Sequence, residues 1–373
     1  MDVLDLFRLM LSKGASDLFV TVGAPPSLKV DGQVLPVKTE TLTSETSRQL
    51  VHSLMSDAQR RHFETDKDAN FAVNPEGLGR FRVNAFQQQG QAGMVIRRIS
   101  AHIPSFEELN LTSPILEKIA MMRRGLVFFV GGTGTGKSST QAAMVGYRNR
   151  HTRGHIVTVE DPIEFVHEHD RCIVTQREVG VDTTSYRSAL ENAMRQAPDV
   201  IQIGEVRTSE TMKSAIVFAE TGHLCLATLH ANNTYQALER IINLYPDDTR
   251  DHLYMDLSMN LNAIVSQRLV PSANDGGFVP AVEIMLNSPL ISDLILKGEI
   301  DGIRDAIEKS TNDGMVTFDQ SLFDLFEKGL ITYEDAMRSA DSVNNLRLKI
   351  KLEGKMAQGQ NDLGSTFEQV EFQ

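Results

Sequence analysis

The sequence of 373 residues has few cysteines, no long apolar run and no excess of positive charge, and each shortage excludes a class of protein. Its two cysteines, Cys172 and Cys225, are too few for a disulfide framework or a four-cysteine zinc site, and Cys225 falls in an apolar stretch typical of a core. There is no signal peptide and no apolar run of the roughly 18 residues that cross a bilayer, so we expect a protein of the reducing cytosol without direct membrane insertion. The net charge of −12 argues against nonspecific binding of nucleic acid, although a local basic groove stays open.

A glycine-rich stretch after an apolar run is the strongest signal that the sequence does contain. The residues 126–130 predict a buried strand, and a helical pattern begins at Lys137. Between them the sequence fits the phosphate-loop pattern G-x-x-x-x-G-K-[ST] in its required context of strand, loop and helix. The residues predicted to bind phosphate are Gly131, Gly132, Thr133, Gly134, Thr135, Gly136, Lys137 and Ser138, followed by Ser139.

The chemistry of this loop predicts ATP and magnesium as its ligands. Glycines let backbone N–H groups turn toward phosphate oxygens, and the start of the helix adds a positive field. Lys137 would bridge the outer phosphates and act in catalysis, while Ser138 would hold magnesium. GTP is disfavoured because no Asn-Lys-x-Asp segment for reading guanine follows the loop.

The order of elements predicts an α/β protein with two folded domains. Helical and strand patterns alternate in the first hundred residues, and from residue 114 short apolar strands alternate with helices, as in a parallel sheet. A hairpin is expected to turn at Asp275-Gly276-Gly277. The predicted divisions are an N-terminal domain at 1–100, a linker at 101–113, a nucleotide-binding core at 114–285, C-terminal helices at 286–352 and a disordered tail at 353–373.

Two groups of carboxylates follow predicted strands, where ligands bind in open α/β sheets. Glu160, Asp161 and Glu164 follow the strand ending at 159, and they could hold magnesium, partly through water, or form an ordinary acidic loop. Glu205 follows the strand at 200–204 and is predicted to orient the water that attacks the γ-phosphate. If Glu205 is structural, that catalytic role passes to Glu164.

Two histidines flank the predicted strand at 224–229. His223 is predicted to bind the nucleotide and His230 to take part in catalysis; the alternative is that each is a satisfied residue of the core. The strand between them would hold the two side chains about 20 Å apart, which argues against a shared zinc ion.

The clusters, in this order, resemble those of the ring-forming secretion and pilus ATPases, and within that superfamily the chain resembles the type IV pilus retraction ATPases, the PilT and PilU group. The resemblance covers roughly residues 1–350 and includes Gly79-Arg80-Phe81-Arg82-Val83-Asn84 and Met315-x-Thr317-Phe318-Asp319-Gln320-Ser321-Leu322. Extension and secretion ATPases usually carry a four-cysteine zinc module, which this chain lacks. Departures from the PilT pattern at 196–197, at Thr208 and at 290–295 favour the PilU branch.

The resemblance implies a PAS-like N-terminal domain, a RecA-like P-loop ATPase core and a homo-hexamer with nucleotide held between the two domains. It also implies that four arginines reach the phosphates, Arg82 in catalysis and Arg80, Arg97 and Arg98 in binding. From the residues alone, a solvated face is the alternative for these four.

The function that the resemblance implies is that of an accessory motor for pilus retraction, in twitching motility and DNA uptake. Such a protein would work in the cytoplasm at the inner-membrane base of the pilus machine, with a PilT-type motor and a membrane platform protein as partners. Alternatives are a self-sufficient retraction motor, a nucleotide-gated scaffold and a nucleic-acid translocase. The net charge and the lack of a basic-aromatic patch argue against the last.

Overall fold

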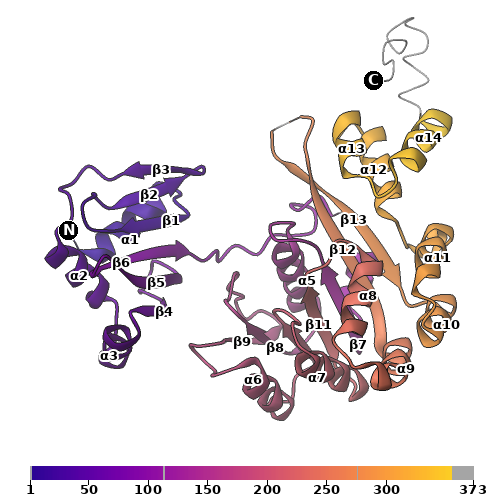
Figure 1. Ribbon diagram of the computed structural model, residues 1–373, viewed down its shortest axis with the longest axis horizontal. Helices are drawn as coiled ribbons and strands as arrows, with labels where there is room; N and C mark the ends of the chain where they lie inside the picture. Colours follow the sequence, from indigo (N-terminus) through magenta and orange to yellow (C-terminus); the bar gives the residue numbers. More distant parts are fainter. Residues whose placement is uncertain (1, 112–113, 275, 355–373) are drawn as a thin grey trace, which may run out of the picture. The chain divides into compact units, whose positions relative to one another are not determined.

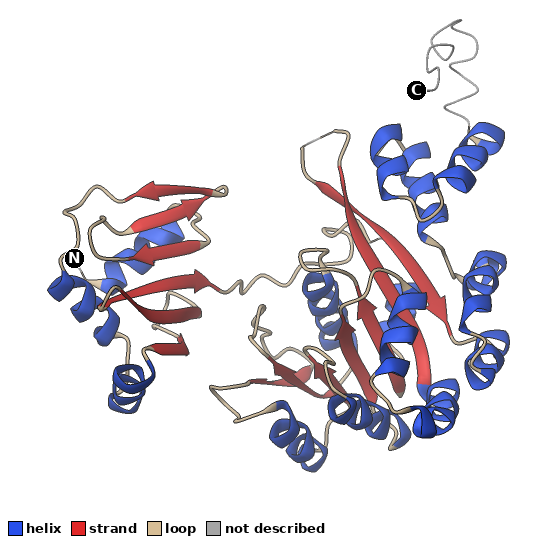
Figure 2. Cartoon of the chain, in the orientation of Figure 1, coloured by secondary structure: helices blue, strands red, loops and turns tan. Residues whose placement is uncertain are grey.

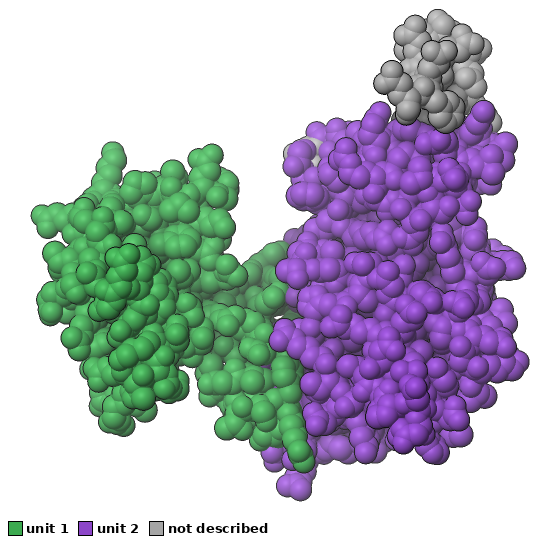
Figure 3. Space-filling model, in the orientation of Figure 1, with its two compact units in different colours: residues 1–103, 161–168, 176–189 green, residues 104–160, 169–175, 190–373 purple. Residues whose placement is uncertain are grey.

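The computed structural model describes residues 2–111, 114–274 and 276–354 (Figure 1). These residues form two compact units, coloured separately in Figure 3. The first unit comprises residues 1–103, 161–168 and 176–189, and the second comprises 104–160, 169–175 and 190–373. The predicted turn residue Asp275 and the tail from residue 355 lie outside the described residues.

The chain up to residue 98 folds as a sheet of six strands with three helices. All neighbouring strands are antiparallel, in the order β3-β2-β1-β6-β5-β4. The strand β4 is not predicted by the sequence pattern; the other elements are. Their bounds are α1 (Val3–Ser12), β1 (Asp17–Val20), β2 (Ser27–Val30), β3 (Gln33–Pro36), α2 (Ser44–Ser53), α3 (Asp57–Asp66), β4 (Asp68–Val73), β5 (Phe81–Gln88) and β6 (Gln91–Arg98).

Local sequence explains how these elements begin and which face they bury. Capping boxes at Thr43 and Ser56 start α2 and α3. In each, the N-cap hydroxyl accepts a hydrogen bond from the backbone N–H three residues later, and that residue's side-chain oxygen accepts one from the N-cap N–H. Apolar residues at helical spacing bury one face of α1, where Phe7 stacks on Phe81 of β5 with ring centroids 4.3 Å apart. Both phenylalanines are fully buried, so this pair lies at the centre of the small core.

From residue 114 the chain forms a mixed sheet with helices on both faces (Figure 2). Four short 3₁₀ helices join the longer elements. The bounds are α4 (Pro114–Ala120), β7 (Gly125–Val130), α5 (Lys137–His151), β8 (Gly154–Glu160), β9 (Cys172–Glu178), α6 (Tyr186–Ala193), η1 (Met194–Gln196), β10 (Val200–Ile203), α7 (Ser209–Glu220), β11 (Leu224–Leu229), α8 (Thr234–Asn243), η2 (Asp247–Thr249), α9 (Arg250–Asn260), β12 (Leu261–Pro271), β13 (Phe278–Leu286), α10 (Pro289–Lys297), η3 (Ile300–Gly302), α11 (Ile303–Lys309), η4 (Thr311–Asp313), α12 (Phe318–Glu327), α13 (Tyr333–Ser339) and α14 (Val343–Glu353).

The sheet has the order β13-β12-β7-β11-β10-β8-β9, and the five strands from β12 to β8 run parallel, as predicted. Two details differ from the expectation. The sequence pattern predicts no strand at the position of β9. The apolar pattern after Pro114 predicts a helix closed by Gly125, but the helix ends at Ala120 and Gly125 starts β7. Arg148 of α5 explains the early end, because its Nη1 donates to the carbonyls of Ala120 and Met122 and satisfies them outside the helix.

The faces of the sheet are covered by different helices. Helices α4 and α5 pack on the face that carries Val127 and Phe129, while α7 and α8 contact strands from the other side. The C-terminal helices α12 to α14 form a separate cluster against the far half of the β12–β13 hairpin, around Phe318. Within the described ranges, no helix combines the length and apolarity needed to cross a bilayer.

Replacing Phe7 by alanine should lower the unfolding free energy of the first unit by about 3–5 kcal/mol, because a fully buried ring would leave a cavity opposite Phe81. Hydrogen exchange of α1 to β6 in increasing urea measures this change. The matched control is Val34→Ala on β3, where a side chain 55% exposed should alter stability by less than about 0.5 kcal/mol. Equal stability of the two variants would contradict the assignment of Phe7 to the core.

Candidate nucleotide site

The parallel register brings several predicted residues to one edge of the sheet. Val130 at the end of β7 pairs with Leu229 of β11, and Ile203 of β10 pairs with residues of both β11 and β8. The segments that follow these strands carry the phosphate loop, His230, Glu205 and Glu160. Because the carboxyl ends of parallel strands meet at one edge, these groups share the place where α/β sheets bind ligands.

The phosphate loop has the backbone conformation that its glycines allow. Gly134 and Gly136 have φ of +79° and +87°, values that favour residues without Cβ, and Gly136 is the N-cap of α5. The Nζ of Lys137 donates to the carbonyl of Gly132 at 2.6 Å, and the hydroxyl of Thr135 donates to the same oxygen at 3.0 Å. Ser138 and Ser139 lie with Lys137 in the first turn of α5, where backbone N–H groups lack partners within the helix and attract anions.

Gln267 of β12 supports this loop, and sequence reasoning missed it. Its Oε1 accepts a hydrogen bond from Thr140 of α5 at 2.6 Å. A Cβ on Gly131 would lie 2.7 Å from the carbonyl oxygen of Gln267, and a Cβ on Gly136 would lie 2.7 Å from its Nε2. The loop glycines are therefore required by this close approach as well as by their φ angles. The available signal was the polar stretch Ser266-Gln267-Arg268 inside the apolar run of β12.

Glu205 lies at the centre of a small ionic cluster. One of its oxygens, Oε2, contacts Nη2 of Arg207 at 2.6 Å and accepts from Nε of Arg207 at 2.7 Å. The other oxygen lies 3.3 Å from Nε2 of His230. The carboxylate is 13% exposed, so it is held by both partners while still reaching solvent. Glu205 and His230, each predicted to act in catalysis, therefore lie within contact distance of one another.

The pKa of His230 is shifted by its surroundings. Burial lowers this pKa below its ordinary value of 6.5, and the positive charges of Lys137, Arg240 and Arg207 lower it further. The carboxylate of Glu205 acts in the opposite direction and raises it. The imidazole is therefore mainly neutral near pH 7.

A pocket of about 600 Å³ opens beside the loop. One wall consists of Gly132 and Thr133, and another consists of the segment His230 to Asn232. Helix α8 completes the lining with polar residues that sequence reasoning did not select: Gln236, Glu239, Arg240 and Asn243. The segment after β11 is thus part of the wall that a bound nucleotide would contact.

His223 is not brought to this site within the chain. It precedes β11, its carbonyl accepts the N–H of Gly125 at the start of β7, and its Nδ1 lies 3.0 Å from the hydroxyl of Thr221. It therefore lies at the amino edge of the sheet, a strand length of about 20 Å from the phosphate loop. The direction of a parallel strand separates the two histidines, and a binding role for His223 stays a prediction.

The acidic group is divided between the two units. Glu160 belongs to the second unit, is buried and accepts a hydrogen bond from Thr158 at 2.6 Å. Its strand β8 is the third from β7 in the sheet order, so its Cα lies about 14 Å from the phosphate-loop strand. Asp161 and Glu164 belong to the first unit, and their roles stay predictions.

The four arginines belong to the first unit and differ in their contacts. Nη2 of Arg80 donates to Glu178 at 2.9 Å, and Nε of Arg97 donates to Asp17 at 2.8 Å. Arg82 lies opposite Arg97 in the sheet, and neither Arg82 nor Arg98 has an ion pair with a described residue. Two of the four are thus held by carboxylates, while Arg82 and Arg98 keep their donors for other partners.

One residue of the phosphate loop offers an oxygen ligand for a magnesium ion carried with the nucleotide. Among the described residues, no group of three or more His, Cys, Asp or Glu could enclose a metal. Mg²⁺ commonly takes one or two protein ligands and completes its shell with phosphate oxygens and water. The hydroxyl of Ser138 at the start of α5 is a donor of the required kind.

Comparison with known proteins places the chain among secretion and pilus ATPases. Residues 4–286 match the family described as Type II/IV secretion system protein. The sequence is 56% identical to the Type IV pilus ATPase PilU of Pseudomonas aeruginosa, over 93% of this chain and 91% of that one. It is 39% identical to the retraction ATPase PilT of the same organism, over 92% of this chain and 100% of that one. A crystal structure of the pilus retraction motor PilT with bound ADP superposes with a TM-score of 0.87 and 37% identity, covering 93% of this chain and 99% of that one.

The pKa of His230 should lie below 6.5 and should fall further in Glu205→Gln, because the charge that raises it is then removed. NMR titration of protein with ¹³C-labelled histidine measures both values, and His230→Gln assigns the resonance. Since the folded pKa is below the unfolded one, His230 has no effect on stability well above pH 6.5 and destabilises the fold as pH falls through that value. A pKa that rises in Glu205→Gln would contradict the arrangement.

Proposed function

The chain belongs to the type II/IV secretion system protein family and is an ATPase of the type IV pilus machinery, and on this premise we propose that it is a homo-hexameric accessory motor for pilus retraction. Its cellular place would be the cytoplasmic base of the pilus machine at the inner membrane, where it acts on a platform protein together with a PilT-type motor. The observation that carries the proposal is the shared edge of the phosphate loop, Glu205 and His230.

The chemistry proposed for this edge is attack of water on the γ-phosphate. Lys137 and the N–H groups of the first turn of α5 bind the phosphates and spread their charge. Glu205 orients the attacking water with one carboxylate oxygen, and Arg207 and His230 hold that carboxylate in place. A neutral imidazole carries a single N–H, so His230 can donate to Glu205 or, once a nucleotide is bound, to a phosphate oxygen instead.

Magnesium would be held by Ser138 and, through water, by Glu164. When bound, it would neutralise charge on the outer phosphates. The fit rests on the Ser138 hydroxyl at the start of α5. The place of Glu164 in this shell is a proposal that comes from its acidic neighbourhood in the sequence.

Arg82 is the proposed arginine that stabilises the transition state. Arg82 lies on β5 directly opposite Arg97 of β6, and like charges in this position repel each other. Because Arg97 already pairs with Asp17, the repulsion favours binding of an anion from outside the chain by Arg82. Arg80 and Arg97 already have carboxylate partners in the first unit. In a hexamer, the phosphates of an ATP could be that anionic partner.

The accessory role rests on where the sequence departs from the PilT pattern. The stretch 290–295 lies in α10, where Ile291 and Ile295 are buried and Leu290 is 52% exposed. The residues proposed for hydrolysis are all present, so the departure affects traction and not chemistry. Hydrolysis without independent traction is what an accessory motor requires.

Glu205→Gln should reduce kcat by about 10²–10⁴-fold and leave ATP binding nearly unchanged, because the amide keeps the shape of the carboxylate but cannot orient water as a base does. Lys137→Ala should lose binding and turnover together, since the outer phosphates lose their compensating charge. Phosphate release and fluorescent-nucleotide binding by the purified protein measure both, and Glu210→Gln on the exposed first turn of α7 is the matched control. Loss of ATP binding in Glu205→Gln would make Glu205 structural.

Retraction in cells should need the PilT-type partner but not the partner's own hydrolysis. We expect no retraction by this protein alone, and retraction when the partner is present with its catalytic glutamate disabled. Fluorescence microscopy of labelled pili in strains with each combination provides the measurement, with Glu205→Gln in this chain as the control that should stop the rescue. Retraction without any PilT-type protein would instead establish a self-sufficient motor.

A further inference from the structure

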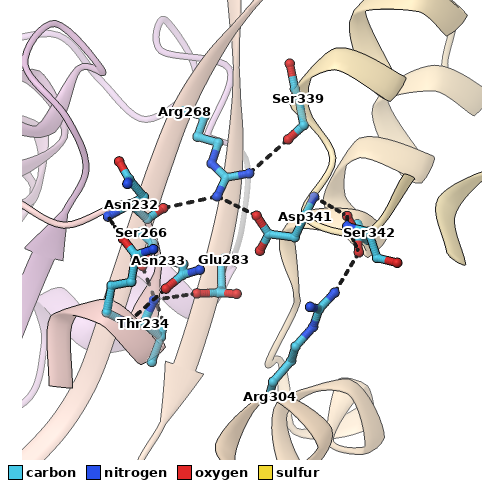
Figure 4. Close-up of polar contacts among 12 residues, drawn as sticks. Asn232, Asn233, Thr234, Ser266, Arg268, Glu283, Arg304, Ser339, Asp341 and Ser342 are labelled. Carbon is cyan, nitrogen blue, oxygen red and sulfur yellow. Dashed lines mark hydrogen bonds and ion pairs between the residues drawn. The ribbon is translucent and has the colours of Figure 1, made fainter. Parts of the chain in front are cut away.

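One guanidinium in the second unit contacts three segments that are far apart in the sequence. Nη2 of Arg268 on β12 lies 2.6 Å from Oδ1 of Asp341 and donates to the carbonyl of Asn232 at 3.2 Å. Nη1 donates to the carbonyl of Ser339 at 2.9 Å (Figure 4). The guanidinium carbon also lies 3.9 Å from the centroid of the Phe318 ring. Arg268 thus joins the segment after β11 to the C-terminal helices.

The segment after β11 is the wall of the nucleotide pocket, and it is fixed at its far end. His230 and Asn232 both line the pocket beside the phosphate loop. At the other end, the N–H of Thr234 donates to Oε1 of the buried Glu283 at 2.7 Å, which anchors the start of α8 to β13 (Figure 4). A displacement of residues 230–232 by a nucleotide would therefore be held at Thr234 and would act on the contact with Arg268.

The opposite end of the contact is the turn between α13 and α14. The N–H groups of Asp341 and Ser342 donate to the carboxylate of Asp319 on α12, at 2.8 and 3.1 Å, and Arg304 of α11 pairs with the same carboxylate at 2.9 Å. The turn is thus connected to two further helices. A shift of Ser339 and Asp341 would be transmitted to α11 and α12 through Asp319.

The contacts of Arg268 are strong enough to carry such a shift. The side chains of Arg268 and Asp341 are only 23% and 17% exposed, so water screens their attraction less than on an open surface. Charge-assisted hydrogen bonds between partly buried groups are shorter and stronger than neutral ones. Lysine could not replace this geometry, because a single ammonium lacks the planar fork that serves Asn232, Ser339 and Asp341 together.

We propose that Arg268 is a positioning residue that couples the nucleotide site to the C-terminal helices, by moving the turn at 339–342 when the pocket wall at 230–232 moves. The inference rests on the proposed function, because it takes the pocket beside the phosphate loop as the nucleotide site. It also works in reverse, since any partner that moves α12 to α14 would shift the segment that carries His230.

Hydrogen exchange of the full-length protein, with and without MgADP or a non-hydrolysable ATP analogue, tests the coupling. In the wild type, nucleotide should change exchange in both 230–236 and 333–353. In Arg268→Gln the change at 230–236 should persist and the change at 333–353 should be lost. The matched control is Arg338→Gln on α13, whose side chain is 77% exposed and pairs with Asp335; this variant should behave as the wild type.

Two results would overturn the inference: a wild type in which nucleotide leaves 333–353 unchanged, or an Arg268→Gln variant that keeps the change. A residue that only stabilises the C-terminal helices would alter their exchange equally with and without nucleotide. If Arg268→Gln does not fold, Asp341→Asn removes the charge of the pair from the other side and is read in the same way.

Steady-state kinetics separates this inference from the proposed function. Arg268→Gln should lower kcat about tenfold and change KM by less than about twofold, because it loosens the segment that carries His230 without touching the phosphate loop. Arg268→Lys should recover only part of kcat. Absence of turnover in the wild type would refute the proposed function, whereas normal kcat in Arg268→Gln beside an active wild type would refute the coupling alone.

Discussion

The common register of β7, β11 and β10 is the constraint on which the site depends. Each strand pairs in parallel with its neighbour, so the three strands end at one edge and the groups that follow them meet there. Glu205 and His230 approach within 3.3 Å for this reason. A slip of one residue in β10 would turn its side chains to the opposite face and remove the carboxylate from the site.

Strand β12 contributes to both sides of the sheet, because the side chains of its adjacent residues point to opposite faces. Gln267 points toward α5 and the phosphate loop, whereas Arg268 points toward the segment after β11 and the C-terminal helices. The two side chains share one stretch of backbone, which is held in the sheet by β7 and β13. The same strand therefore supports the phosphate loop and connects the site to residues that follow it by more than seventy positions.

The sequence predicted what depends on neighbouring residues and missed what depends on distant ones. The phosphate loop and the strand ending before Glu205 are local patterns, and the structure contains both of them. The contacts of Gln267 and Arg268 join positions 36 to 127 residues apart, which no local pattern reports. For His223 the local pattern was misleading. It lies only seven residues before His230 in the sequence, but the fully extended strand β11 between them places the two side chains at opposite edges of the sheet.

The departure from the PilT pattern and the network at Arg268 lie at different ends of the sheet. Leu286, just before α10, pairs with Ala263 near the start of β12, so α10 lies at the amino edge, away from the phosphate loop. The C-terminal helices instead pack against Val270 and Val279, where the hairpin extends beyond the carboxyl edge. A change in α10 can therefore alter one mechanical surface and leave the hydrolytic edge and its link to α12 intact. This separation is compatible with the proposed accessory motor, because one surface can differ without a change at the edge that carries the phosphate loop.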